Sequence, residues 1–422
     1  MWQSIRSISS LLFSFAMLML GQGMINTLLG LRSRIEGFST ETTGLIMTGQ
    51  FIGMLIGAFL ALRVIAAVGH IRSFAAFASI LSVAVLAHVL FTDPIFWFFL
   101  RIVTGFCMAG MIMVVESWVN EKSSNENRGK ILSLYMITNY IGAGSGQFMM
   151  LLGDPAQFQL FVIGSMVYSF ALVPILLTRA KAPTPSSPKR MAFKKLFLVS
   201  PVGVFGTVCA AMSNSSLNSM GAVFGKDVNL TIPQISSFMA AAIFGGMLLQ
   251  FPIGRISDRF DRRTVLIFSS LLTIGSCFAV IWATGQSFII LIAAVALYGG
   301  MSFTIYPISA SQVNDMADRK ELVQVSAGLL IAYGVGASLG PTIAAQFMAY
   351  LGPEGMFVFF MINNSLLVIF TIIRIFQRRR HGESKAPFLP LGGNGMSSKQ
   401  LYTAAIKAET SIEKDKKPQS QL

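Results

Sequence analysis

The sequence predicts an all-α membrane protein with twelve transmembrane helices in two pseudo-symmetric six-helix bundles. Of its 422 residues, 54% are hydrophobic and only 12% are charged, whereas a soluble domain carries about 25% charged residues. Apolar runs long enough to cross a hydrocarbon layer about 30 Å thick recur along almost the whole chain. Continuous runs of this length favour helices over a β-barrel, whose strands show about ten residues of alternating hydrophobicity.

The apolar runs place the twelve helices in order along the chain. The first run lacks a small-residue cleavage site and is too long for a secretory signal, so we expect it to remain as a membrane span. The fifth and eleventh runs are rich in glycine, which lets helix backbones approach closely. The predicted spans are 8–31, 41–66, 71–92, 94–118, 131–152, 157–178, 197–224, 233–253, 264–284, 287–311, 322–350 and 354–376.

Lysine and arginine residues are unevenly distributed between the two sides of this arrangement. Only Arg32, Arg34 and Lys226 lie in loops that follow odd-numbered helices, while the other loops and both termini hold nearly all the rest. The positive-inside rule therefore predicts that both termini are cytoplasmic. The net charge of +14 is then a topology signal, with attraction to anionic lipids of the bilayer as a second effect. Its placement argues against a nucleic-acid partner.

Composition also divides the chain into parts. Residues 179–196 contain the run KAPTPSSPKR, which predicts a cytoplasmic linker. The linker separates an N-terminal six-helix bundle, residues 1–178, from a C-terminal bundle, residues 197–376. Residues 377–422 are predicted to form a disordered cytoplasmic tail.

The two halves carry an internal repeat. An offset of 193 residues aligns Tyr140 in the fifth helix with Tyr333 in the eleventh, and the neighbouring stretches NYIGAGSG and AYGVGASLG are visibly related. The repeat supports two bundles of the same topology.

The most distinctive motif is the charged run from Gly254 to Arg263, which lies between the eighth and ninth spans. It fits the pattern G-x-x-x-D-R-x-(G/D)-R-R and resembles the short cytoplasmic loop of the major facilitator superfamily of secondary transporters. The stretches GFCMAGMIMVVESWVN and VGHIRSFAAFAS resemble the YcaD-like branch of the bacterial major facilitators. The resemblance implies a permease of the bacterial inner membrane that works as a monomer, and it does not name a cargo.

Six residues are predicted to act in gating between two conformations. A carboxylate at position 116 can pair with loop arginines in one state and lose them in the other; the alternative is a plain helix-end carboxylate. The charges of the 254–263 motif can likewise be paired when the cytoplasmic side is closed and hydrated when it opens, although a solvated loop would also be charged. The gating candidates are Glu116, Arg128, Gly254, Asp258, Arg259 and Arg262.

Solute contacts should come from polar groups on membrane helices, because such groups are costly in lipid and usually serve a function. Arg101 is a candidate fixed charge for an anionic or carbonyl group; alternatively, it extends to the periplasmic surface. The neutral candidates could instead join helices by hydrogen bonds worth about 1 kcal/mol each. The binding candidates are Gln22, Asn26, Arg101, Asn139, Tyr140, Asn214, Asn218, Tyr306 and Tyr333.

The sequence contains no Walker loop, no zinc-ligand spacing and no nucleophile paired with a base, so we expect neither an enzyme nor a cofactor or metal. We predict a secondary active transporter that moves a small solute by alternating access, with uptake favoured. Proton-coupled efflux of a drug or metabolite is one alternative, with protons as the candidate coupling ion, but Gly146-Gln147 replaces the Gly-Pro of the antiporter motif. A transport-dead membrane sensor or scaffold is another alternative.

Overall fold

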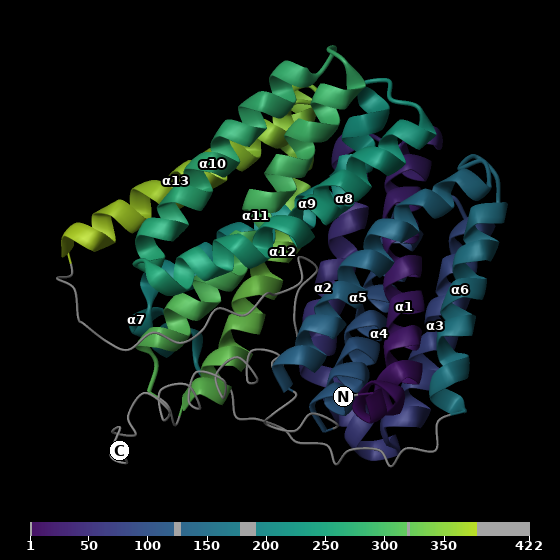
Figure 1. Ribbon diagram of the computed structural model, residues 1–422. Coiled ribbons are helices and arrows are strands. Elements are labelled where there is room, and N and C mark those ends of the chain that lie inside the picture. The colour runs from purple at the N-terminus through teal and green to yellow at the C-terminus, as the bar shows by residue number, and fades with distance from the viewer. Residues whose placement is uncertain (1, 122–127, 178–190, 319–320, 378–422) are drawn as a thin grey trace.

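The computed structural model describes residues 2–121, 128–177, 191–318 and 321–377, and these residues form helices without any strand (Figure 1). The predicted tail, 377–422, lies outside the described residues except for Gln377, and so does most of the predicted linker. The helices are α1 Trp2–Ile35, α2 Thr40–Val68, α3 His70–Leu90, α4 Pro94–Glu121, α5 Arg128–Phe148, the 3₁₀ helix η1 Met149–Leu152, α6 Gln159–Leu176, α7 Phe193–Val199, α8 Pro201–Asp227, α9 Ile232–Arg259, α10 Arg262–Ala283, α11 Phe288–Met316, α12 Leu322–Leu351 and α13 Gly355–Gln377.

Each of the twelve predicted spans corresponds to a long helix, which confirms the predicted fold class. Ten helices of the described chain are long and apolar enough to cross a membrane. The other two long helices, α5 and α8, have 21 and 27 residues but are more polar. Most of α8 is buried, so its polar groups face protein, where neighbouring helices can satisfy them.

The predicted span 197–224 is wrong at its start, because the helix is interrupted at Ser200. The residue before a proline is disfavoured in the helical region, and Ser200 adopts an extended backbone with φ −148° and ψ 90°. Pro201 then begins α8, and the Ser200 side chain accepts a hydrogen bond from the amide of Gly203. The residues before this break form the short helix α7.

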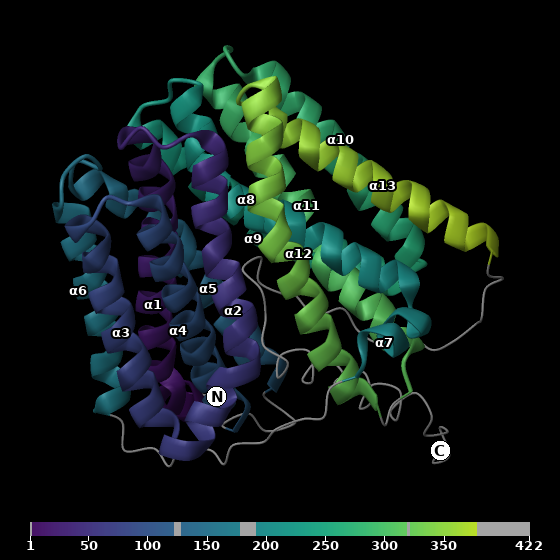
Figure 2. The same ribbon diagram turned by 180° about the vertical axis from the view of Figure 1, so that it is seen from behind.

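Helices α1 to α6 form one bundle and α8 to α13 form the other (Figures 1 and 2). Each bundle contains a pair of helices that approach each other closely at glycine residues. A Cβ atom at Gly53 or Gly105 would lie 2.0 or 1.9 Å from a backbone oxygen of the facing helix, which joins α2 tightly to α4. Gly245 and Gly299 join α9 to α11 in the same way, with 2.0 Å at each, and follow the first pair by 192 and 194 residues. These matched contacts are the pseudo-symmetry expected from the internal repeat.

The two ends of the molecule can be named by the residues they carry. The Arg34 end holds the turns that follow α1, α3, α8, α10 and α12, and the Arg262 end holds those that follow α2 and α9. Across the bundles α2 packs on α12, α5 on α9 and α1 on α8. The helices of the two bundles lie close together at the Arg34 end and diverge toward the Arg262 end in both views (Figures 1 and 2).

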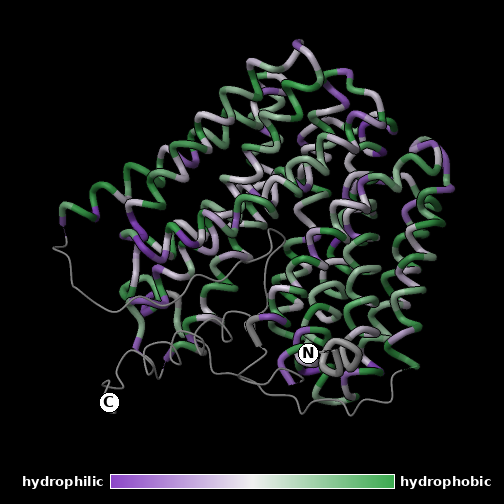
Figure 3. The backbone as a smooth tube through the Cα atoms, in the orientation of Figure 1, coloured by the Kyte–Doolittle hydropathy of each residue, from purple (hydrophilic) through white to green (hydrophobic). Residues whose placement is uncertain are grey.

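Apolar residues recur along the whole length of the helices (Figure 3), and many of the large ones are exposed. Large apolar side chains such as Ile289, Phe278 and Phe376 are 78%, 60% and 86% exposed. A soluble protein rarely exposes so much apolar surface. These faces are therefore suited to contact the hydrocarbon of a bilayer.

Candidate functional site

The structure brings two binding candidates together in the N-terminal bundle. Arg101 on α4 donates from Nη2 to Oδ1 of Asn26 on α1 over 2.9 Å, and its side chain is only 2% exposed. Its Nε is buried and makes no hydrogen bond within the described chain. A buried guanidinium with a neutral partner keeps its positive charge uncompensated, which is costly unless a ligand shares it. The prediction that this arginine extends to the surface is thus disfavoured by its burial.

Three further candidates, all tyrosines, lie where the bundles meet. The rings of Tyr306 on α11 and Tyr333 on α12 have centroids 4.6 Å apart. The Tyr306 hydroxyl is buried and makes no hydrogen bond within the described chain. Tyr140 on α5 donates across the bundles to Oε1 of Gln250 on α9 over 3.1 Å. The Tyr140 hydrogen bond thus crosses between the bundles, whereas the Tyr306–Tyr333 contact joins α11 to α12 within the C-terminal bundle.

The amide candidates are distributed differently. Asn214 accepts a hydrogen bond from Ser302 on α11, and Asn218 donates to the backbone oxygen of Asn214 one turn earlier. The first bond joins α8 to α11 and the second lies within α8, while the buried Nδ2 of Asn214 makes no hydrogen bond within the described chain. Gln22 is buried and Asn139 is half-buried. Neither residue takes part in the hydrogen bond between Arg101 and Asn26.

Glu116 lies at the end of α4 nearer the Arg262 end. It is 1% exposed and accepts a hydrogen bond from the hydroxyl of Tyr135 on α5 over 3.1 Å. Arg128 is the first residue of α5, and its side chain lies outside the described part of the structure. An interaction between the two is therefore a prediction that the structure leaves untested.

Arg262 is the centre of the charged motif. Its side chain is 1% exposed and joins three helices of the C-terminal bundle. It forms an ion pair with Asp315 at the end of α11, donates to Ser257 Oγ over 3.2 Å and approaches Asp258 at 3.5 Å. In this conformation the motif thus joins α9, α10 and α11 within the C-terminal bundle.

Two other gating candidates flank this cluster: Gly254 is buried within α9, and Arg259 is exposed at its end. Asp315, the strongest partner of Arg262, was missed by the sequence reasoning. It lies just beyond the predicted span 287–311, and α11 continues to Met316. The signal that could have identified Asp315 is its position: it is an acidic residue just beyond the end of a predicted span, at the same end of the molecule as the charged motif.

A second group that the sequence reasoning missed joins the bundles at the Arg34 end. Arg34 on α1 donates from Nε to Oδ1 of Asp227 on α8 over 3.2 Å. The hydroxyls of Thr48 on α2 and Thr342 on α12 lie 2.8 Å apart. In the sequence, Arg34 contributes only to the topology signal, because its acidic partner Asp227 lies 193 residues away.

No group of three or more potential metal ligands occurs among the described residues. The three cysteines, Cys107, Cys209 and Cys277, are buried free thiols. The polar centres described above are built from guanidinium groups, of which those of Arg101 and Arg262 are buried, together with carboxylates near helix ends, amides and hydroxyls.

Comparisons with known proteins agree with this architecture. The sequence matches the profile of the Major Facilitator Superfamily over residues 11–202 and again over 203–409. It is similar to the MFS-type transporter YcaD of Escherichia fergusonii, at 25% identity over 355 residues that cover 84% of this chain and 92% of that protein. The protein of the same name from Shigella flexneri serotype 5b is 28% identical over 359 residues, with the same coverage of 84% and 92%. The resemblance to the YcaD-like branch is thereby confirmed.

The fold is also similar to solved transporter structures. The nucleoside transporter NupG superposes with a TM-score of 0.72 at 16% identity and covers 88% of this chain and 99% of its own. A bacterial homologue of the human lysosomal transporter Spinster, in an inward-facing and occupied conformation, gives a TM-score of 0.67 at 16% identity, covering 89% and 98%. These likenesses concern the fold alone. With both halves of the sequence matched and twelve long helices in two bundles, the chain belongs to the Major Facilitator Superfamily of membrane transporters.

Proposed function

We propose that this protein is a secondary active transporter that takes up a small solute across the bacterial inner membrane by alternating access. In this proposal both termini are cytoplasmic, so the Arg34 end faces the periplasm and the Arg262 end faces the cytoplasm. The conformation described above is then inward-facing.

One observation carries the proposal: the bundles are joined by contacts between side chains that can separate. The Arg34–Asp227 ion pair and the Thr48–Thr342 hydrogen bond lie at the Arg34 end. Each is a polar contact that water can replace at small cost. A carrier needs such differential contacts, because they are made in one state and lost in the other.

In this proposal the charged motif supplies the contacts that form at the Arg262 end when the cytoplasmic side closes. Asp258 is 35% exposed and only 3.5 Å from Arg262, so its carboxylate can exchange partners as the bundles close at the Arg262 end. Glu116, with Arg128 as its proposed partner, would act in the N-terminal bundle. In this proposal the contacts of Arg262 with Asp315 on α11 and Ser257 on α9 keep α9, α10 and α11 together while the bundle moves as a rigid body.

We place the solute between the bundles, with Arg101 and Asn26 on one side and Tyr306 and Tyr333 on the other. The buried Nε of Arg101 and the hydroxyl of Tyr306 offer hydrogen-bond donors without partners in the described chain. Donors of this kind favour a solute with a carboxylate, phosphate or carbonyl oxygen. The aromatic pair at 4.6 Å supplies an apolar contact surface.

Uptake is preferred over proton-coupled efflux because Gln147 occupies the place of the antiporter proline. Its side chain donates to the backbone oxygen of Gly23 and accepts a hydrogen bond from Thr27, which joins α5 to α1. A proline could make neither bond.

A thermal-shift screen of the purified protein in detergent tests this proposal. A solute at a hundred times its dissociation constant stabilises a protein by about 2.7 kcal/mol. We expect a stabilising solute that carries an oxyanion or carbonyl group, with the shift lost in Arg101→Ala and Asn26→Ala. Arg255→Ala is the matched control, because Arg255 is exposed on α9 and stacks over Phe251. No stabilising solute in a panel of sugars, organic acids, amino acids, nucleosides and vitamins, or a shift unchanged by both substitutions, would overturn the proposal.

A further inference from the structure

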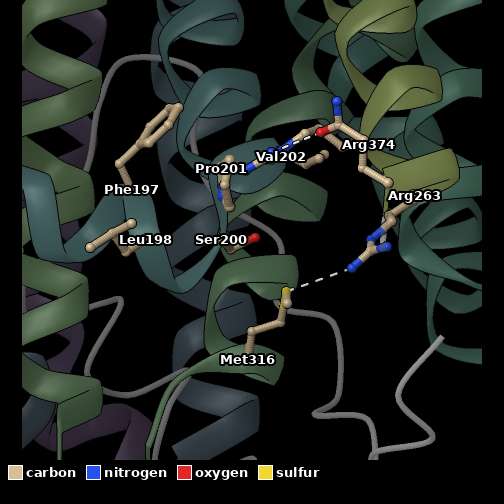
Figure 4. Close-up of a pocket in the computed structure, with 9 residues that line it drawn as sticks. Phe197, Leu198, Ser200, Pro201, Val202, Arg263, Met316 and Arg374 are labelled. Atoms are coloured by element: carbon tan, nitrogen blue, oxygen red, sulfur yellow. Dashed lines mark hydrogen bonds between the residues drawn. The ribbon is translucent and has the colours of Figure 1, made fainter. Parts of the chain in front are cut away.

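A pocket of about 250 Å³ lies at the Arg262 end, on the C-terminal bundle and away from the Arg101 and Tyr306 groups. It is formed where the break between α7 and α8 faces the beginning of α10 and the ends of α11 and α13 (Figure 4). Its lining residues are Phe197, Leu198, Ser200, Pro201, Val202, Arg263, Met316, Arg374 and Gln377. The transport proposal assigns no role to this pocket.

Two arginines from different helices give the pocket a positive charge. Arg263 of α10 points toward Met316, and its Nη2 lies 3.9 Å from the methionine sulfur (Figure 4). Arg374 of α13 donates to the side-chain oxygen of Gln377 over 3.0 Å. Both contacts are with neutral groups, and none of the described lining residues is acidic. The pocket therefore presents two guanidinium groups that an anion can neutralise.

Two carboxylates adjacent in sequence to the lining residues or close to them, Asp315 and Asp261, make contacts with other groups. Asp315, beside Met316, is paired with Arg262. Asp261 caps α10 by accepting a hydrogen bond from the backbone amide of Arg263. Val202 is the second residue of α8, and an amide at that position has no partner within its own helix. The pocket thus joins two side-chain cations to the positive end of a helix dipole.

The surface around the pocket is apolar. Leu198 on α7 is 69% exposed, and Phe376 and Ile373 near the end of α13 are 86% and 47% exposed. Lys194 and Lys195 lie on the same short helix α7. Cations beside exposed apolar side chains are typical of a membrane interface, where one part contacts headgroups and the other contacts acyl chains.

We propose that this pocket binds the phosphate of an anionic glycerophospholipid in the cytoplasmic leaflet. Planar guanidinium groups bind phosphate oxygens in a bidentate manner. The pocket volume of about 250 Å³ suits a headgroup, while the acyl chains lie on the exposed apolar faces of α7 and α13. A soluble phosphate compound would share the headgroup chemistry but would gain nothing from these faces. The cytoplasmic placement depends on the orientation proposed above, whereas the charge and shape of the pocket do not.

Binding to the full-length protein in neutral detergent tests the proposal. Phosphatidylglycerol is titrated and the thermal unfolding shift recorded, with phosphatidylcholine and inorganic phosphate as separate arms. We expect phosphatidylglycerol alone to stabilise the protein at low lipid-to-protein ratios. Arg263→Gln and Arg374→Gln should each weaken its apparent affinity about fivefold, and the double variant about twentyfold. Arg255→Gln, an exposed arginine on α9, is the matched control and should leave the affinity unchanged.

Gln377→Glu provides a second variant with little risk to folding, because residue 377 is exposed at the end of α13. The new carboxylate would compete for Arg374 and should weaken phosphatidylglycerol binding in the same direction. Equal stabilisation by phosphatidylcholine would overturn the proposal, as would undiminished affinity in the double variant and in Gln377→Glu. Equal stabilisation by inorganic phosphate would assign the pocket to a soluble anion and would also overturn it. None of these outcomes depends on a transported solute.

Discussion

The guanidinium of Arg34 on α1 donates to the carboxylate of Asp227 on α8, with 3.2 Å between Nε and Oδ1. The pair joins the two bundles at the Arg34 end, where the side chains remain 27% and 19% exposed. An ion pair with this much exposure contributes about 1 kcal/mol or less. Such a contact favours one conformation over another by a factor of about five without preventing the change.

Neutralising this pair should shift the population toward a state that is open at the Arg34 end. We expect Asp227→Asn to raise the labelling rate of a cysteine introduced as Thr48→Cys by about two- to fivefold, since the lost pair is worth about 1 kcal/mol or less. The measurement is labelling with a membrane-impermeant maleimide, corrected for the protein without the Thr48→Cys change. The exchanged pair Arg34→Asp/Asp227→Arg should restore the original rate. An unchanged rate in Asp227→Asn would show that the pair does not hold this end closed.

A side chain at Gly44 should separate the bundles more strongly. A Cβ atom there would lie 2.3 Å from the Cβ of Ala345 and 2.9 Å from the backbone oxygen of Pro341, both on α12. We expect Gly44→Val to lengthen the distance between spin labels at Ser39 and Leu351, measured by pulsed electron paramagnetic resonance. Gly275→Val is the control, because nothing lies within 4 Å of a Cβ at that glycine. A distance distribution identical to that of the parent would contradict the described packing of α2 on α12.

The repeated glycine contacts should be critical for stability inside each bundle. A methyl group at Gly53 would lie 2.0 Å from the backbone oxygen of Ile102, so α2 and α4 must move apart. Overpacking of this kind costs about 1–3 kcal/mol, and we expect Gly53→Ala to lower the unfolding temperature accordingly. Gly275→Ala has open space around it and should be neutral or slightly stabilising, because alanine favours a helix. Equal unfolding temperatures for the two variants would refute the close approach.

Breaking the Arg262 cluster should destabilise the C-terminal bundle. In Asp315→Asn the guanidinium of Arg262, which is 1% exposed, loses its principal negative partner. We expect the free energy of unfolding to fall by about 3 kcal/mol. This value is at the low end for a broken buried ion pair, because Asp315 is 13% exposed. Thermal unfolding measures it, and Arg259→Gln on the exposed end of α9 is the matched control. A loss no larger than that of the control would mean that the cluster is a solvated loop.

The helices were predictable because apolar length and glycine content are local properties of the sequence. The pairing of Arg101 with Asn26 was not, although both were candidates, because helix rotation decides which groups meet across 75 residues of sequence. Likewise Asp315 and Asp227 lie near helix ends, where the sequence cannot show which bundle their carboxylates will face. The charged motif was predictable from the sequence. The pairing of its Arg262 with Asp315 was not, because the two residues are 53 positions apart and meet only in the folded bundle.

Cross-linking at the Arg34 end tests the central claim of alternating access most directly. The hydroxyls of Thr48 and Thr342 lie 2.8 Å apart, so Thr48→Cys/Thr342→Cys should form a disulfide between α2 and α12 upon oxidation. The protein is reconstituted in liposomes, and uptake of the solute found in the thermal-shift screen is followed before and after oxidation. We predict that oxidation abolishes uptake, that a reductant restores it, and that each single cysteine variant transports in both conditions. Undiminished uptake by the fully cross-linked protein, or no uptake by the reduced one, would contradict the account.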